Sequence, residues 1–358
     1  MKEKLFAALL FLGVFATAEA APSQEWERVV EAAKREGEVS ILGTTGTEAR
    51  DALTLPFQKA YGLRVEYFGA TGSQGASRIA LERRAGKYLW DVFIGGTTTG
   101  LVSMIPIGAF DPMEPALILP EVKEPKNWRG GELEFVDPGR QMLVLTPTHR
   151  VIFAVNTDLV DPKSFKSYKD FLAPKWKGQI VMDDPRQAGS SQATFTFFYL
   201  HPELGPDFIR ALARQEPTVL RDPGQSINML GQGKYPILIG PRDTILVDAI
   251  RRKLPIGAVN PRQMREGSDI SPGPGNVALF NRPRNLNAAK VYLNWLLSKD
   301  GQYQFSRALG YVSKRLDVPN DFAEPWRVPQ PGAIKTYTRE AIDLKETLTR
   351  LLNEVLKK

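Results

Sequence analysis

The feature that most constrains the fold is a unit of strand, loop and helix that occurs three times early in the chain. Strand-like apolar runs at residues 39–43, 63–69 and 90–96 each end at glycine, and the loops TTGTE, ATGSQG and TTTG follow them. Strands that alternate with helices are joined by right-handed crossovers into a parallel sheet. Ligands bind beyond the carboxyl ends of such strands, so we expect the three loops to meet at one ligand-binding edge.

The chemistry of these loops is that of a general anion site rather than of a nucleotide site. The chain has no G-x-x-x-x-G-K-[ST] motif, and Gly69, Gly72 and Gly75 do not have the spacing of the dinucleotide fingerprint. Each loop would open a helix and offer backbone N–H groups together with Thr or Ser hydroxyls. The alternative is that each hydroxyl only caps its helix. Three such loops at one edge favour a shared ligand.

The rest of the chain predicts a second α/β lobe. An apolar run at residues 151–155 would leave the first lobe, strand–loop–helix follows at residues 179–200, and residues 276–280 would return as a second crossing strand. The expected boundaries are lobe 1 at residues 21–150 and 282–358, lobe 2 at residues 157–275, and crossing strands at residues 151–156 and 276–281. The apolar stripe Ala341, Leu344, Leu348, Leu351, Leu352 and Val355 marks a final helix that packs in a core or docks a partner.

The second lobe carries two further candidate loops. Ser190 and Ser191 open a helix, and Arg186 before them could bind an anion or pair with Asp183 or Asp184. A second loop follows the apolar run at residues 237–239, where Arg242 could grip a carboxylate or phosphate in a bidentate way. Its alternative is an internal ion pair with Asp243 or Asp248.

Length and the first residues indicate an exported two-domain protein. The 358 residues suffice for two domains. Lys2 and Lys4, an apolar run at residues 5–16 and the sequence Ala18-Glu19-Ala20 have the three parts of a secretory signal, which we expect to be cut after about Ala20. The apolar run is shorter than the ~20 residues of a membrane span, although a permanent anchor is the alternative. We expect a periplasmic protein.

Composition narrows the class of function. The net charge is +7, but the basic residues are scattered, which favours anionic small molecules over nucleic acid. The chain has no cysteine, and its two histidines, His149 and His201, are too few for a three-histidine metal site. Motifs for a catalytic serine are missing, and no carboxylate pair stands out. We therefore expect a binding protein without cofactor or bound metal rather than an enzyme.

Three segments carry a resemblance to a known family. EWERVVEAAKREGEVSILG, YKDFLAPKWKGQIVMDDPR and NLNAAKVYLNWLLSKDGQYQFSRALGYVSKR resemble bacterial extracellular solute-binding proteins, in the group that includes the periplasmic ferric-iron-binding proteins of ABC importers. The resemblance implies a type II periplasmic binding fold, in which two α/β lobes joined by two crossing strands close on a small solute. It also implies delivery of that solute to the membrane permease of an ABC importer. We expect a monomer.

By position, the ligand loops of that family fall on the loops already described. The candidate ligand-binding residues are Thr44, Thr45, Ser73, Gln74, Thr97, Thr98, Ser190, Ser191, Arg242 and Asp243. The iron-binding members use two adjacent tyrosines near the last of these segments, whereas this chain has no Tyr-Tyr pair anywhere. We therefore expect a small anion as the solute. Ferric iron, an exported enzyme on the same fold and a partner of a membrane sensor are the alternatives.

Overall fold

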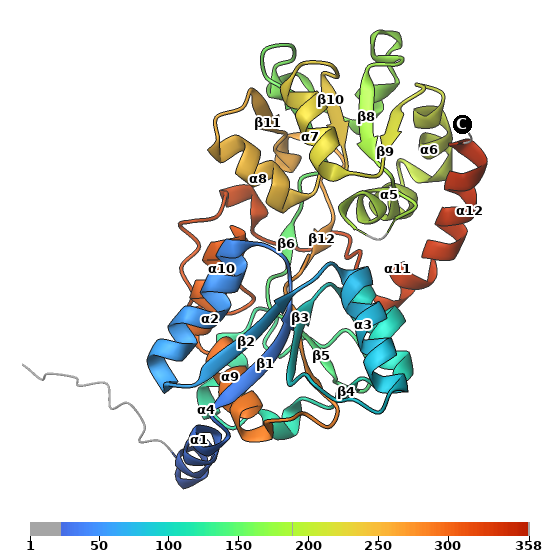
Figure 1. Ribbon diagram of the computed structural model, residues 1–358. Coiled ribbons are helices and arrows are strands. Elements are labelled where there is room, and N and C mark those ends of the chain that lie inside the picture. Colours follow the sequence, from blue (N-terminus) through green and yellow to red (C-terminus); the bar gives the residue numbers. More distant parts are fainter. Residues whose placement is uncertain (1–22, 188, 357–358) are drawn as a thin grey trace, which may run out of the picture.

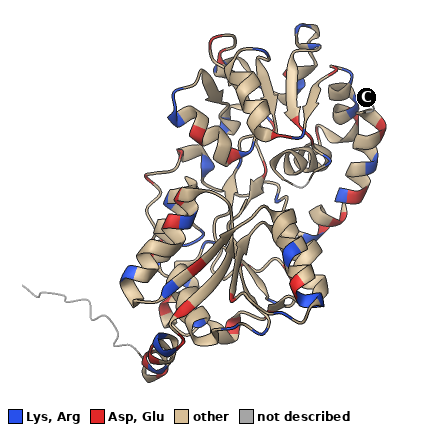
Figure 2. Ribbon diagram, in the orientation of Figure 1, with Lys and Arg blue, Asp and Glu red and all other residues tan. Residues whose placement is uncertain are grey.

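Two α/β lobes, each built around its own sheet, make up the structure (Figure 1). The computed structural model describes residues 23–187 and 189–356, so the predicted signal segment lies outside the described residues. Within these ranges, no helix is both long enough and apolar enough to cross a membrane. Basic and acidic residues are mixed along the chain in both lobes (Figure 2).

The first lobe contains the three predicted units, although the third continues into short π- and 3-10-helical turns (Thr99–Met104 and Ile105–Ile107) rather than an α-helix. Its sheet has the order β2-β1-β3-β13-β4, and β5 also pairs with β13. Strands β1, β2 and β3 are parallel, as the alternating pattern predicts, whereas β13 runs antiparallel to β3. The strands are β1 (Glu38–Gly43), β2 (Arg64–Gly69), β3 (Val92–Gly95), β4 (Phe110–Asp111), β5 (Met142–Val144) and β13 (Asn276–Phe280). The main helices are α1 (Gln24–Glu36), α2 (Thr47–Tyr61), α3 (Gly72–Arg84), α9 (Leu286–Leu297) and α10 (Lys299–Leu309).

The second lobe has a mixed sheet with the order β11-β7-β10-β8-β9. Its strands are β7 (Phe153–Asn156), β8 (Ile180–Asp183), β9 (Thr218–Leu220), β10 (Ile237–Ile239) and β11 (Ile256–Ala258). Its helices are α5 (Ser190–Leu200), α6 (Gly205–Ala213), α7 (Pro223–Gly231) and α8 (Asp243–Arg251). A cluster of buried aromatic rings, with Phe153 packed edge-on against Phe171 at 4.7 Å between centroids, fills one side of the sheet. Along the chain, α5 follows the carboxyl end of β8, and α8 follows the carboxyl end of β10.

The crossing strands differ from those expected. The apolar segments at residues 151–156 and 276–281 do not span the lobes, because β7 and β13 each lie inside one sheet. A two-stranded antiparallel ribbon of β6 (Thr148–His149) and β12 (Ile270–Ser271) lies between the lobes instead (Figure 1). The physical reason is burial: continuous apolar runs are stabilised inside a sheet, whereas the ribbon between the lobes is short and largely polar.

The C-terminal helices also depart from the expected boundaries. Helix α11 (Arg339–Asp343) leads into α12 (Lys345–Val355), whose Leu348, Leu351 and Leu352 are buried in the core of the second lobe. Residues 282–358 were expected to belong entirely to the first lobe. The apolar stripe does pack in a core, as predicted, but it packs on α5 and α6 at the edge of the second lobe (Figure 1). A stripe indicates that a helix is half-buried and does not indicate which surface covers it.

Candidate functional site

A polar cavity of about 630 Å³ lies between the lobes and receives residues from both. The loops that follow β1, β2 and β3 all line it, so the three Gly/Thr/Ser loops do lie together at the carboxyl edge of the first sheet. Two of these loops approach closely, because a Cβ atom added at Gly72 would lie 2.2 Å from the Thr99 hydroxyl oxygen. Glycine at this position lets the backbone of the second loop pack against the third.

Most of the candidate ligand residues line this cavity, and two do not. Those that line it are Thr44, Thr45, Ser73, Thr97, Thr98, Ser190, Arg242 and Asp243. Gln74 instead accepts a hydrogen bond from the Thr71 backbone N–H at 3.1 Å and completes a capping box at the start of α3. Ser191 is buried, and its hydroxyl donates to the Asp183 carbonyl oxygen at 2.6 Å. These two side chains therefore form hydrogen bonds within the protein and do not line the cavity.

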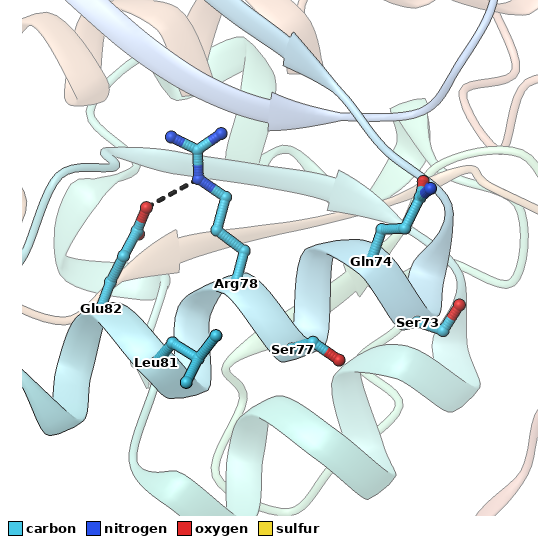
Figure 3. A pocket seen from close by; sticks show the side chains of 6 residues that line it. All are labelled: Ser73, Gln74, Ser77, Arg78, Leu81 and Glu82. Atoms are coloured by element: carbon cyan, nitrogen blue, oxygen red, sulfur yellow. Dashed lines mark hydrogen bonds and ion pairs between the residues drawn. The ribbon is translucent and has the colours of Figure 1, made fainter.

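Gln74 belongs to a separate hollow on the outer face of α3 (Figure 3). There the Arg78 Nε donates to Glu82 at 2.7 Å, and the indole N–H of Trp90 donates to the other Glu82 oxygen at 2.9 Å. The Arg78 guanidinium also lies 4.1 Å from the centroid of the Phe68 ring. The charged groups of this hollow therefore satisfy one another, and one helix forms its lining.

Arg242 lines the cavity without an ion-pair partner among the described residues. Its expected internal partners are occupied elsewhere: Asp243 pairs with Arg327 at 2.8 Å, and Asp248 pairs with Arg252 at 2.8 Å. Within the described residues, no carboxylate lies at ion-pair distance from Arg242. The guanidinium fork of Arg242, at the start of α8, is therefore available to an anion.

Arg186 is not available in this way. Two of its nitrogens donate to the two carboxylate oxygens of Asp184, at 2.7 Å and 2.9 Å. The guanidinium of Arg186 holds the pKa of the Asp184 carboxyl below its ordinary value, against the effect of burial. Arg186 does not line the cavity, so of the two arginines considered from the sequence, only Arg242 reaches it.

Asp243 lines the cavity, but its carboxylate is engaged inside the protein. Its Oδ2 accepts from the Arg327 guanidinium at 2.8 Å and from the Tyr311 hydroxyl at 3.4 Å. Its Oδ1 has no hydrogen-bond partner among the described residues and almost no exposed surface. The negative charge of Asp243 is therefore held by Arg327 and is not offered to a solute.

Sequence reasoning missed several residues that line the cavity. They are Arg150, Gln187, Gln192, Thr244, Ser271, Tyr311, Thr336, Tyr337 and Lys345. Arg150 is buried beside the ribbon between the lobes, where it pairs with Asp269 at 3.0 Å and donates to the Thr194 hydroxyl at 2.8 Å. Arg150 directly precedes the apolar run at residues 151–155, and this position could have identified it as a candidate. Tyr311, Tyr337 and Lys345 come from the C-terminal segment, and no local pattern in the sequence marks them.

The oxygen donors of the cavity suit ferric iron poorly. The Tyr311 hydroxyl donates to Asp243, and the Tyr337 hydroxyl donates to Glu134 at 2.9 Å. Burial raises the pKa of both phenols above the ordinary value, which disfavours the phenolate form that would bind the metal. Among the described residues, no group of three or more His, Cys, Asp or Glu side chains is placed to hold a metal ion.

The two sheets, the ribbon between them and the shared polar cavity define a two-lobed binding protein with the type II periplasmic binding fold. The model of the family described as bacterial extracellular solute-binding protein matches residues 52–330. The chain therefore belongs to this family. A curated protein of Haemophilus influenzae, described as uncharacterized, is 23% identical over 261 residues, which cover 70% of each chain.

Solved structures of periplasmic binding proteins share the fold. AfuA from Actinobacillus pleuropneumoniae, with fructose-6-phosphate bound, is 17% identical with a TM-score of 0.63 over 89% of this chain and 97% of that one. A FutA protein from Trichodesmium, in complex with iron and citrate, is 19% identical with a TM-score of 0.64 over 90% and 100%. The apo ferric ion-binding protein A of Pasteurella haemolytica is 16% identical with a TM-score of 0.67 over 89% and 98%. At these identities the likeness concerns the fold.

Proposed function

We propose that this protein is the periplasmic solute-binding component of an ABC importer and that it captures a small anionic solute between its lobes. The observation that carries the proposal is Arg242, a cation in the interlobe cavity with no carboxylate partner among the described residues. In this proposal the protein is exported as a monomer after cleavage near Ala20, delivers the solute unchanged to the permease, and catalyses no reaction.

The charges of the cavity support an anion. Arg150 is neutralised by Asp269, and Asp243 is neutralised by Arg327. Arg242 and Lys345, for which the described part of the chain places no carboxylate at ion-pair distance, are both cationic. Hydroxyls of Thr44, Thr45 and Ser190, close to helix starts, add neutral donors of the kind that bind carboxylate or phosphate oxygens, whereas the Thr97 hydroxyl donates to Asn276.

Residues of both lobes line the cavity, and this explains how a solute would be captured. Thr44, Thr97 and Ser73 belong to the first lobe, whereas Ser190 and Arg242 belong to the second. A solute that contacts both sets gains its full interaction only when the lobes are together, so binding shifts the population toward the closed arrangement. Ferric iron, the alternative from the sequence, is less well supported because both cavity tyrosines are engaged as neutral donors.

The test is a thermal melt of the mature chain with a defined set of solutes. Inorganic phosphate, citrate, fructose 6-phosphate, neutral fructose and ferric chloride are compared. A solute present at 100 times its Kd adds about 2.7 kcal/mol to the free energy of unfolding. We expect at least one organic anion to raise the melting temperature and neutral fructose to leave it unchanged. A shift with ferric chloride and none with any anion would contradict the proposal.

Arg242→Met tests the residue that carries the proposal. Loss of a hydrogen bond to a charged group costs about 1.5–3 kcal/mol, so we expect titration calorimetry to show binding weaker by about 10- to 100-fold. Arg252→Met is the matched control. Arg252 is exposed at the C-terminal end of the same helix, and its substitution removes the same charge. Equal loss in both variants would indicate a general effect of net charge rather than a contact of Arg242.

A further inference from the structure

The C-terminal segment brings a lysine into the cavity from outside both sheets. After α10 in the first lobe, the chain passes the ribbon between the lobes, where the Thr336 N–H donates to the Ile270 carbonyl oxygen at 3.2 Å. Helix α12 then packs on α5 and α6 of the second lobe, with Leu348 and Leu352 in its core. Lys345 is the first residue of this helix, and its position is therefore fixed by the second lobe.

The Lys345 ammonium reaches across to the first lobe. Its Nζ donates to the hydroxyl of Thr98, in the loop that follows β3, and both residues line the cavity. An ammonium has three donors, and this hydroxyl is the one hydrogen-bond acceptor found for Lys345 in the described part of the chain. No carboxylate there lies within ion-pair distance of it. Lys345 lies beyond residues 52–330, so the family match does not account for it.

A largely buried ammonium without a carboxylate is unfavourable in the protein without solute. Burial lowers the pKa of Lys345 to about 8, which reflects the cost of keeping this charge out of water. A neutral hydroxyl compensates only part of that cost. Other charged or titratable groups of the cavity wall are Arg150, Arg242, Asp243, Tyr311 and Tyr337. Because Asp243 is engaged by Arg327, the wall offers Lys345 no free negative charge.

We propose that Lys345 is a specificity-determining residue of the cavity, which binds the anionic group of the solute and exchanges its bond to Thr98 for that group. The inference rests on the proposed function and deepens it, because it assigns the recognition of charge to a residue of the C-terminal helix. The solute anion then contacts a group held by the second lobe beside the third loop of the first lobe. A neutral analogue of the solute has no charge to bind Lys345, so the ammonium stays bonded to Thr98 and does not add to the affinity.

Lys345→Met is the decisive variant, because it removes the charge and keeps an unbranched apolar stem of similar length. The probe is whichever of citrate, inorganic phosphate or fructose 6-phosphate raises the melting temperature of the parent chain. We expect calorimetry to show binding of that probe weakened by about 10- to 100-fold. The melting temperature without solute should not fall, since a poorly compensated buried charge has been removed. Lys345→Arg should recover most of the lost affinity.

The matched control is Arg350→Met on the same helix. Arg350 is exposed, donates to the Thr347 hydroxyl and carries the same charge, so its removal should leave binding unchanged. If Arg242→Met abolishes binding of the probe and Lys345→Met leaves it unchanged, the inference is overturned and the proposed function stands. If no anion binds the parent chain, both fail. If Lys345→Met lowers the melting temperature without solute and Lys345→Arg recovers no affinity, Lys345 has a structural role only.

Discussion

At the scale of single residues, Asp183 is a buried acid of the second lobe on which the charge of Arg242 acts. It ends β8 and is 7% exposed, and its Oδ1 has no hydrogen-bond partner among the described residues. Burial raises the pKa of this carboxyl to about 6, although Ser226 and the charge of Arg242 act in the opposite direction. The folded protein therefore favours the protonated acid, and its ionisation at neutral pH is a cost.

This shift predicts how Asp183→Asn changes stability with pH. An acid whose pKa is raised on folding supports the fold below its unfolded pKa, near 3.9, and that support is lost as pH rises through about 6. By pH 7.5 the loss approaches about 3 kcal/mol. We expect Asp183→Asn to gain stability relative to the parent between pH 4 and pH 7.5 in urea unfolding. A difference that stays constant over this range would contradict the buried-acid interpretation.

The same scale shows what the sequence could and could not predict about the site. Arg242 was identified because it follows an apolar strand, a pattern confined to a few neighbouring residues. The partners of Asp243 were not identified, because Arg327 and Tyr311 lie far along the chain. Ion pairs of this kind depend on which segments the fold brings together, and local patterns carry no information about that. Whether a loop hydroxyl lines the cavity, as that of Ser190 does, or is bonded inside the protein, as that of Ser191 is, depends on the same packing.

At the scale of elements, the turn between β10 and α8 depends on a glycine. Gly240 has φ +71°, and a Cβ atom there would lie 2.6 Å from the Ser191 hydroxyl oxygen and 2.7 Å from the Ser191 Cα. We expect Gly240→Ala to lower the free energy of unfolding by about 2–4 kcal/mol, from backbone strain together with the steric clash. Because the clash is with the start of α5, weaker solute binding should accompany the loss.

Gly233 provides the control for this substitution. It has the same φ of +71°, but the nearest atom to an added Cβ is 3.5 Å away, an ordinary contact. Gly233→Ala therefore measures the backbone strain alone, and its unfolding in urea should be less affected than that of Gly240→Ala. Equal losses of stability in the two variants would show that the clash with Ser191 does not contribute to the effect of Gly240→Ala.

The elements also mark the limit of prediction from periodicity. The three strand–loop–helix units and the final amphipathic helix were predicted, because alternation and an apolar stripe are local consequences of burial. The crossing ribbon was missed, since two-residue strands such as β6 and β12 leave no periodic signal. The placement of α12 on the second lobe was missed as well, because Leu348, Leu351 and Leu352 would suit any apolar surface. That error is also why Lys345 was not among the candidate ligand residues.

At the scale of the whole molecule, polar side-chain contacts join the first lobe to the second lobe and its C-terminal helix. They include Arg251 of α8 with Glu48 of α2 at 2.7 Å, Tyr311 with Asp243 at 3.4 Å, and Lys345 with Thr98. The Arg251–Glu48 pair is more than half exposed on both sides, so it adds little stability. Lobes joined by a short ribbon, by the C-terminal segment and by contacts of this kind are expected to move relative to each other.

Closure on the solute therefore predicts a change of shape that small-angle X-ray scattering can measure. A compact chain of this length has a radius of gyration of ~20 Å, and hinge closure should reduce it when a bound anion holds the lobes together. The comparison uses the mature parent chain without solute and with a saturating anion that raises its melting temperature, with Arg242→Met under the same conditions as control. The variant should keep the larger radius at a concentration that closes the parent. A melting shift in the parent without any change in radius would show that the solute binds without closure, since contacts confined to one lobe cannot draw the other toward it.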